Sequence, residues 1–478
     1  MLYNKKHIIK ERIKNMLFLK RGSIKGIVLI IFLSGFVSCE DFVDVNAPKN
    51  LLVSEKVFNN SATVESALAN IYFKMRNEGL LSGNRGMSAL MGCYADELDY
   101  LDNDLNVLEL YQNSVTASNT EIKDWWVQTY NLIYAANDII EGLNNSSQLS
   151  NTDKKPYIGQ ALFIRAFLHS LLVNVYGNIP YIKSTDYIHN NTVSREEAGH
   201  VYDYIIDDLK EAIQLMEMGQ DNDNRVIPNQ ITAKALLARM YLYVTNWDAA
   251  SQMATEVINT SGYQLESDIS KVFLKNSRET IWQFKPDGVN HLNTIEADFF
   301  VIASVNIQRY AMSTNLMEAF ELGDYRKEKW VGEFTNLNNG NIIYFPYKYK
   351  ETLSSTQSLE YSIVFRLAEQ YLIRAEAKAN LGQIQESRSD LNIIRNRAGL
   401  SDSSVDTKEA LIDAILHEKR IELFSEHGHR WFDLIRTNSA SEVLSLVKPN
   451  WQDTDVYLPI PESELELNPN LKPQNEGY

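Results

Sequence analysis

The chain has 478 residues, of which 44% are hydrophobic and 23% are charged, a composition typical of a globular protein with a large interior. Its formal net charge is −16, and removal of the first 38 residues, which hold 8 basic and 1 acidic residue, leaves 38 basic and 61 acidic residues, or −23. Such an acidic surface repels phosphate backbones and anionic headgroups and excludes nucleic acid as an expected partner. With two cysteines, Cys39 and Cys93, the fold has no disulfide framework.

The N-terminal segment has the pattern of an export signal. Lys20, Arg21 and Lys25 precede an apolar run at positions 27–37. This run is shorter than the roughly 20 apolar residues that span a bilayer, so we expect a secretory signal peptide at residues 1–38 and not a membrane-spanning helix. Translation could begin at Met1 or at Met16, because the basic stretch before Met16 is unusually long.

The end of this signal resembles a bacterial lipobox. The cut site reads Phe36-Val37-Ser38-Cys39, with Phe36 in place of the usual leucine. The resemblance implies that Cys39 becomes the acylated first residue of the mature chain and holds the protein on the outer membrane. A plain signal peptide with an incidental cysteine is the alternative.

A tether follows the predicted lipidation site over residues 39–60. Its acidic residues are Glu40, Asp41 and Asp44. They resemble the surface-export tag of certain outer-membrane lipoproteins, and the alternative is a solvated acidic tether with no export role. We therefore expect a lipid-anchored, surface-exposed protein whose single body occupies residues 61–478.

The body is mostly helical by pattern, because apolar side chains recur in steps of three and four residues. The first helix after the tether, Ala62–Met75, shows this stripe clearly. The remaining predicted helices are Ile122–Leu143, Tyr157–Tyr176, His200–Met216, Thr232–Val244, Trp247–Asn259, Val364–Leu381, Ile384–Arg397 and Lys408–Ser425.

Two helix pairs resemble each other at an offset of 136 residues. Positions 236–258 parallel positions 372–394, and each stretch reads as a helix, a tight turn and a second helix. This pattern is typical of tetratricopeptide-like hairpins. Between the pairs, at about 262–360, strand-like runs at 280–284 and 342–345 alternate with turn residues. We therefore predict an all-α helical-repeat scaffold with an irregular loop and short-strand insertion that forms the ligand face.

Four stretches of the chain together resemble the SusD/RagB family of outer-membrane nutrient-binding lipoproteins. The most specific is Glu418–Leu423 followed by Gly428–Leu434. The others are Arg165–Pro180, Arg366–Gly399 and the ending from Leu458 to Tyr478. The resemblance implies a tetratricopeptide-like core, capture of a glycan without catalysis or a cofactor, and delivery to a SusC-like TonB-dependent barrel transporter.

Regions that carry ligand contacts in that family lie after the first helix and in the central insertion. In this chain they offer Arg85, Asp96, Tyr100, Asn103, His291, Trp330 and Tyr344. Sugar recognition requires flat apolar faces and side chains that hydrogen-bond to hydroxyls, and these residue types supply both. Any one aromatic among them could instead belong to the core, where we place Trp282.

Three other groups of residues could have either a chemical or a structural role. His427 and His429 lie among carboxylates that could ligate zinc, but two rings at this spacing diverge on a helix, so we expect no metal site. The acidic run from Asp96 to Asp104 fits a solvated loop, a calcium or ligand site, or a glycosidase pair. Cys93 has no partner pattern for catalysis, and we expect a buried thiol.

The sequence thus predicts a binding protein and not an enzyme. A peptide-binding member of the same family and a lipid-anchored glycosidase are the alternatives. A glycosidase would need two carboxylates at a defined separation across a cleft, which sequence spacing cannot provide.

Overall fold

The computed structural model describes residues 57–81, 83–218, 224–289, 291–304 and 309–478. The predicted signal peptide, Cys39 and the tether up to residue 56 lie outside the described residues.

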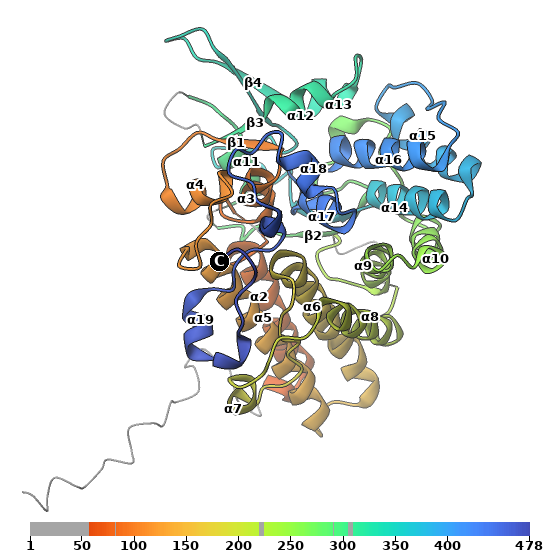
Figure 1. The fold of residues 1–478 in the computed structure, drawn as a ribbon. Coiled ribbons are helices and arrows are strands. Elements are labelled where there is room, and N and C mark those ends of the chain that lie inside the picture. Colours follow the sequence, from red (N-terminus) through yellow and green to blue (C-terminus); the bar gives the residue numbers. More distant parts are fainter. Residues whose placement is uncertain (1–56, 82, 219–223, 290, 305–308) are drawn as a thin grey trace, which may run out of the picture. The chain divides into compact units, whose positions relative to one another are not determined.

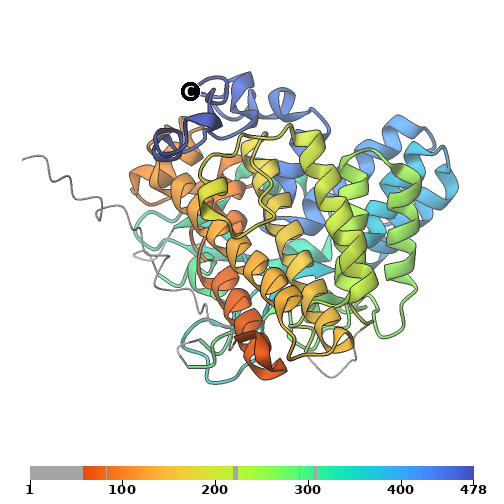
Figure 2. The ribbon, with the colours of Figure 1, turned by 90° about the horizontal axis from the view of Figure 1, so that it is seen from below.

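A row of long helices forms the scaffold, and successive helices are neighbours in space (Figures 1 and 2). The row consists of α2 (Ser61–Asn77), α5 (Thr120–Asn145), α6 (Asn151–Tyr176), α8 (Ala198–Leu215), α9 (Gln230–Tyr243), α10 (Trp247–Ile258), α14 (Leu367–Asn380), α15 (Ile384–Arg397) and α16 (Lys408–Leu423). The mostly helical fold expected from the sequence is confirmed, and the apolar stripes define most of these helices to within a few residues.

Polar caps and turns fix the ends of the scaffold helices. The side chain of Asn119 accepts a hydrogen bond from the backbone of α5, and Ser150 does the same for α6. Helix α6 ends at Gly177, whose φ of 71° favours glycine. Helix α6 is also long and apolar enough to cross a membrane by composition, but 89% of its most apolar stretch is buried inside the protein, which makes it a core helix.

The two predicted hairpins are formed by α9 with α10 and by α14 with α15, and α10 packs against α14. The interface between the hairpins is lined by small side chains, including Ala238, Ala250, Ala254 and Ala377, all fully buried. Small residues let helices approach closely, so the hairpins stack in the manner of tetratricopeptide repeats.

Six short strands pair in twos within the described residues. The pairs are β1 (Leu98–Tyr100) with β3 (Tyr310–Met312), β2 (Thr280–Phe284) with β6 (Ser362–Arg366), and β4 (Val331–Thr335) with β5 (Ile342–Pro346), all antiparallel. The sequence predicted β2 and most of β5. It placed a helix from Val364, but the chain stays extended to Arg366 because β6 pairs with β2 and buries all of its side chains.

Shorter helices connect these parts. They are α3 (Met87–Tyr94), α4 (Leu105–Tyr111), α7 (Tyr187–Asn190), α11 (Glu296–Phe300), α12 (Thr314–Ala319), α13 (Tyr325–Trp330), α17 (His429–Arg436), α18 (Ala440–Leu444) and α19 (Glu462–Leu467). Figure 1 shows β1, β3 and the β4–β5 hairpin gathered near α3 and α4, at the other end of the scaffold from α7.

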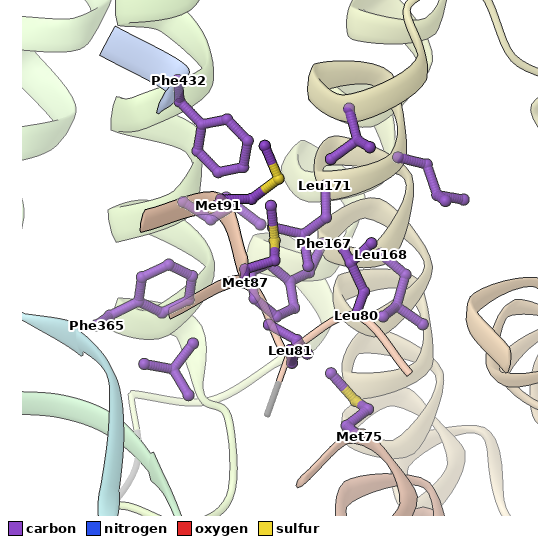
Figure 3. Close-up of a cluster of buried hydrophobic side chains, with 14 of the residues drawn as sticks. Met75, Leu80, Leu81, Met87, Met91, Phe167, Leu168, Leu171, Phe365 and Phe432 are labelled. Atoms are coloured by element: carbon purple, nitrogen blue, oxygen red, sulfur yellow. The ribbon is translucent and has the colours of Figure 1, made fainter. Parts of the chain in front are cut away.

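One hydrophobic core joins the scaffold to the strands. In Figure 3, Met87 and Met91 of α3 point toward Phe167 of α6, with Phe365 of β6 and Phe432 of α17 beside them. All five side chains are at most 2% exposed. Helix α3 was not predicted from the sequence. It fills the core between the first scaffold helices and the strand insertion.

Candidate functional site

The segment with the strongest family resemblance forms a buried ion network. Glu418 and Glu422 of α16 accept hydrogen bonds from Arg326, and Arg366 contacts Glu422 and Glu426. The distance from Arg326 Nη1 to Glu418 Oε1 is 2.6 Å. Burial by itself would raise the pKa of Glu422, but the surrounding arginines hold it well below its usual value. Glu426 is held below its usual pKa in the same way by Arg366 and Lys348, whereas burial raises the pKa of Glu418; all three carboxylates are paired with protein cations.

The neighbouring histidines have structural partners as well. His427 Nε2 lies 2.9 Å from the carbonyl oxygen of Ile363, and burial lowers the pKa of His429 well below its usual value. Within the described ranges, no group of three or more His, Cys, Asp or Glu side chains is arranged to hold a metal ion. The geometry of this segment supports a role in holding the fold together.

The acidic run after α3 divides into buried and exposed members. Asp96 is 3% exposed and forms ion pairs with Arg430 and Arg420, with Asp96 Oδ1 2.7 Å from Arg430 Nε. Glu97 is also buried and accepts a hydrogen bond from the backbone N–H of Ser425. Asp102 is exposed. The first half of the run therefore anchors the loop, and its second half faces solvent.

Arg85, Tyr100 and Asn103 come together around Asp104, although Tyr100 itself is only 9% exposed. Arg85 Nη2 lies 3.0 Å from Asp104 Oδ2, and its Nη1 donates to Glu121. The backbone N–H of Asp104 donates to the hydroxyl of Tyr100 at 3.4 Å. Asn103, which precedes Asp104, is exposed. Three of the seven residues proposed from the sequence thus surround Asp104, the N-cap of α4.

The strand pair β1–β3 holds Tyr100 of this cluster in position. Tyr100 and Tyr310 face each other across the pair with ring centroids 5.6 Å apart. Tyr310 is 1% exposed, and its hydroxyl donates to the carbonyl oxygen of Asn84. Tyr310 therefore joins the segment before Arg85 to β1. Tyr310 could not be predicted from the sequence, because a three-residue strand has too few residues to show an alternating pattern.

Tyr344, the fourth residue proposed from the sequence, lies on the β4–β5 hairpin. Strand β5 lies beside β3, and Tyr344 is half-buried opposite Glu333 of β4. The hydrophobic side chains of Leu101, Leu105 and Ile342 are 43%, 75% and 53% exposed. We call the segments that carry Arg85, Tyr100, Asn103 and Tyr344, which are linked through β1, β3 and β5, the loop surface; they combine exposed apolar side chains with hydrogen-bonding groups.

The other three residues proposed from the sequence lie elsewhere. Trp330 is 1% exposed and donates its indole N–H to the carbonyl oxygen of Ile269 at 3.0 Å. Asp96 is held by its two arginines. Neither side chain is accessible to a bound sugar in this conformation, so both are left out of the loop surface. His291 is half-buried on a separate loop near Asp298.

Two further side chains have the structural roles expected from the sequence. Cys93 is fully buried and free, and burial raises the pKa of its thiol to about 12, so it is a poor nucleophile. Trp282 is 0% exposed and lies among Phe163, Phe167 and Phe365 in the core.

Comparisons with known proteins agree with this architecture. A family model described as "Starch-binding associating with outer membrane" matches residues 41–242, and one described as "SusD family" matches residues 282–478. A SusD-like protein of Formosa agariphila is 26% identical, over 96% of this chain and 100% of the relative. A SusD-like protein of Bacteroides ovatus is 24% identical, over 84% of this chain and 80% of the relative.

Solved structures show the same fold. A SusD superfamily protein from Bacteroides vulgatus superposes with a TM-score of 0.77 at 23% identity, and the match covers 88% of this chain and 100% of that one. A structure titled "Laminarin binding SusD-like protein" also gives a TM-score of 0.77, at 22% identity and the same coverage. The helical-repeat scaffold, the strand insertion and the two family matches lead to one conclusion: the chain belongs to the SusD/RagB family.

Proposed function

We propose that this protein binds an oligosaccharide or polysaccharide at the loop surface and delivers it to a TonB-dependent transporter, without breaking a bond. The observation that carries the proposal is the meeting of the solvent-accessible Arg85 and Asn103 with the largely buried Tyr100 around Asp104, next to the strands that lead to the β4–β5 hairpin with Tyr344. A rigid helical scaffold holds these segments, and the similar laminarin-binding protein has the same fold.

The chemistry of the loop surface suits a sugar ligand. Tyr344 and the exposed apolar side chains can cover the C–H faces of a pyranose ring. The amide of Asn103 can both donate to and accept from hydroxyl groups, while Arg85, with a side chain that is 40% exposed, can donate. Binding of this kind gathers the ligand by contact alone.

The carboxylates near the loop surface support binding over hydrolysis. A glycosidase needs one carboxyl group that keeps its proton and a second that acts on the sugar or on water. Asp96 is locked between arginines, and the side chain of Asp104 caps α4 and holds Arg85. Asp99 accepts a hydrogen bond from the hydroxyl of Tyr111 at 3.1 Å. These groups already serve the fold.

We further propose that Cys39 carries the acyl chains that anchor the protein to the outer membrane with its body at the cell surface. Each buried methylene contributes about 0.8 kcal/mol, and more than one chain is needed for stable attachment. The family match described as associating with the outer membrane begins at residue 41, two residues after this cysteine.

Affinity electrophoresis of the purified protein in gels that contain starch, laminarin or xylan, together with calorimetric titration of a peptide digest, tests the proposal. We expect at least one glycan to retard the protein and the digest to give no heat of binding. Binding to peptides alone would replace the glycan with a peptide ligand. New reducing ends after incubation with a glycan would establish hydrolysis instead.

A further inference from the structure

Arg85 is the cation at the centre of the loop surface, and two carboxylates of the protein already neutralise it. Asp104 Oδ2 accepts from Arg85 Nη2 at 3.0 Å, and Glu121 accepts from Nη1. The hydrogen bond from Arg85 lowers the pKa of Asp104, which therefore stays ionised, whereas burial raises the pKa of Glu121 against the opposing effect of Arg85. Both outer nitrogens of the guanidinium are thus occupied by carboxylate oxygens, although the arginine side chain is 40% exposed.

The charges around this triad are mainly negative. Two cations and four carboxylates surround the loop surface: Arg85, Arg309, Asp102, Asp104, Glu121 and Glu333. Arg309 is exposed beside Tyr310, whereas Glu333 lies opposite Tyr344 on the hairpin. At physiological ionic strength charges act over about 8 Å, so a ligand on this surface meets a field that repels anions.

We infer that the loop surface selects neutral glycans and rejects polyanionic ones, because Asp104 and Glu121 occupy the arginine that would otherwise pair with a sugar carboxylate or sulfate. The inference rests on the proposed function. An anionic sugar is disfavoured for two reasons. The protein carboxylates repel it, and it would have to displace one of them to reach Arg85. A hydroxyl group can instead use one of the three remaining N–H donors of Arg85 or the amide of Asn103 without breaking the triad.

The first test compares matched probes. Neutral laminarin, starch and xylan are set against polygalacturonate, alginate and laminarin oxidised to carboxylate at its primary hydroxyls, all by affinity electrophoresis with the purified protein. We expect retardation by at least one neutral glycan and by none of the anionic ones. Retardation by an anionic glycan as strong as by any neutral one would overturn the inference and leave the proposed function standing. Binding to neither set would count against both.

The second test removes one of the two carboxylates that hold Arg85. Asp104→Asn keeps the N-cap, because Oδ1 accepts from the backbone of α4 and asparagine caps as well as aspartate. The atom that faces Arg85 then becomes an amide nitrogen, which cannot accept its hydrogen bond. We expect the affinity for polygalacturonate to rise about tenfold over wild type.

Asp102→Asn is the control, because it removes a nearby exposed carboxylate without freeing Arg85. We expect its affinity for polygalacturonate to change by less than about threefold, as for an exposed charge in water. Circular dichroism melts verify that both variants fold. Equal gains in the two variants would show that only the overall charge matters, and no gain in Asp104→Asn would show that the triad does not exclude anions; either result overturns the inference.

Discussion

Asp96 and Arg430 form a bidentate ion pair across 334 positions of sequence, with Arg430 Nε 2.7 Å from Asp96 Oδ1 and Nη2 3.0 Å from Oδ2. The pair joins the turn between α3 and β1 to α17 in the C-terminal segment. Burial by itself would raise the pKa of Asp96, but Arg430 and Arg420 hold it below its usual value.

Removal of one partner of this pair should destabilise the fold strongly. Asp96→Asn leaves the guanidinium groups of Arg420 and Arg430, whose side chains are 11% and 13% exposed, without the carboxylate that pairs with them, so we expect the free energy of unfolding to fall by about 3–5 kcal/mol in urea titrations. Glu78→Gln, which breaks an exposed pair with Lys74, should cost less than about 1 kcal/mol. Equal effects in the two variants would contradict the proposed anchoring role.

Glu97 should make the stability fall as the pH rises. Burial raises its pKa from 4.5 to about 7, so between these values the folded state keeps a proton that the unfolded chain has lost. Glu97→Gln removes this difference. We expect the variant to be more stable than wild type by about 1–3 kcal/mol at pH 8 and to match it near pH 4 in urea titrations. Asp102→Asn should keep the wild-type pH profile, and parallel curves for all three proteins would refute the expectation.

Tyr344 should contribute directly to ligand affinity. Tyr344→Ala removes the half-buried ring on β5, and we expect about tenfold weaker retardation by the glycan that wild type binds. Tyr187→Ala truncates a ring that is 51% exposed on α7, at the other end of the scaffold, and serves as the matched control. A similar loss in both variants, or in neither, would place the ligand elsewhere.

Asn475 should hold the C-terminal segment in place. Its Nδ2 donates to the carbonyl oxygens of Tyr176 and Leu458 at 2.9 and 2.7 Å, and its Oδ1 accepts from Arg195 at 2.7 Å. Asn475→Ala leaves these groups unpaired, so we expect a loss of about 2–4 kcal/mol in the free energy of unfolding. The neighbouring exposed Glu476 provides the control, and Glu476→Ala should be close to neutral.

Cys39 should be the site of lipidation. When cells are fed labelled palmitate, the wild-type protein should become labelled and partition into detergent, and Cys39→Ala should do neither. Cys93→Ala removes the buried thiol and should be labelled as wild type. Label that persists in Cys39→Ala would show that another residue carries the lipid.

The helical scaffold could be read from the sequence because its signals are local. The apolar stripes gave helices such as Ile384–Arg397 at the observed bounds. The strand β6 was missed because its extended state depends on pairing with β2, which lies about 80 residues away in the chain. Helix α3 was missed because all of its side chains are buried, which removes the amphipathic pattern.

The candidate site was predictable only in part for the same reason. Arg85, Tyr100 and Asn103 lie close in sequence, and local turns bring them together. The burial of Asp96 depends on Arg420 and Arg430, far along the chain, and the burial of Trp330 depends on its packing against Phe273. Residue type alone does not distinguish such anchors from ligand contacts.

The ion network around α16 has a consequence for the β4–β5 hairpin. Arg326 precedes the hairpin and Lys348 follows it, and they end on Glu418 and Glu426. The segments on both sides of the hairpin are thus held by ion pairs to α16 and the turn after it. The tip of the hairpin at residues 336–341 is mostly exposed to solvent. Sequence changes at the tip can therefore alter this exposed part of the hairpin without disturbing the ion pairs that hold its base.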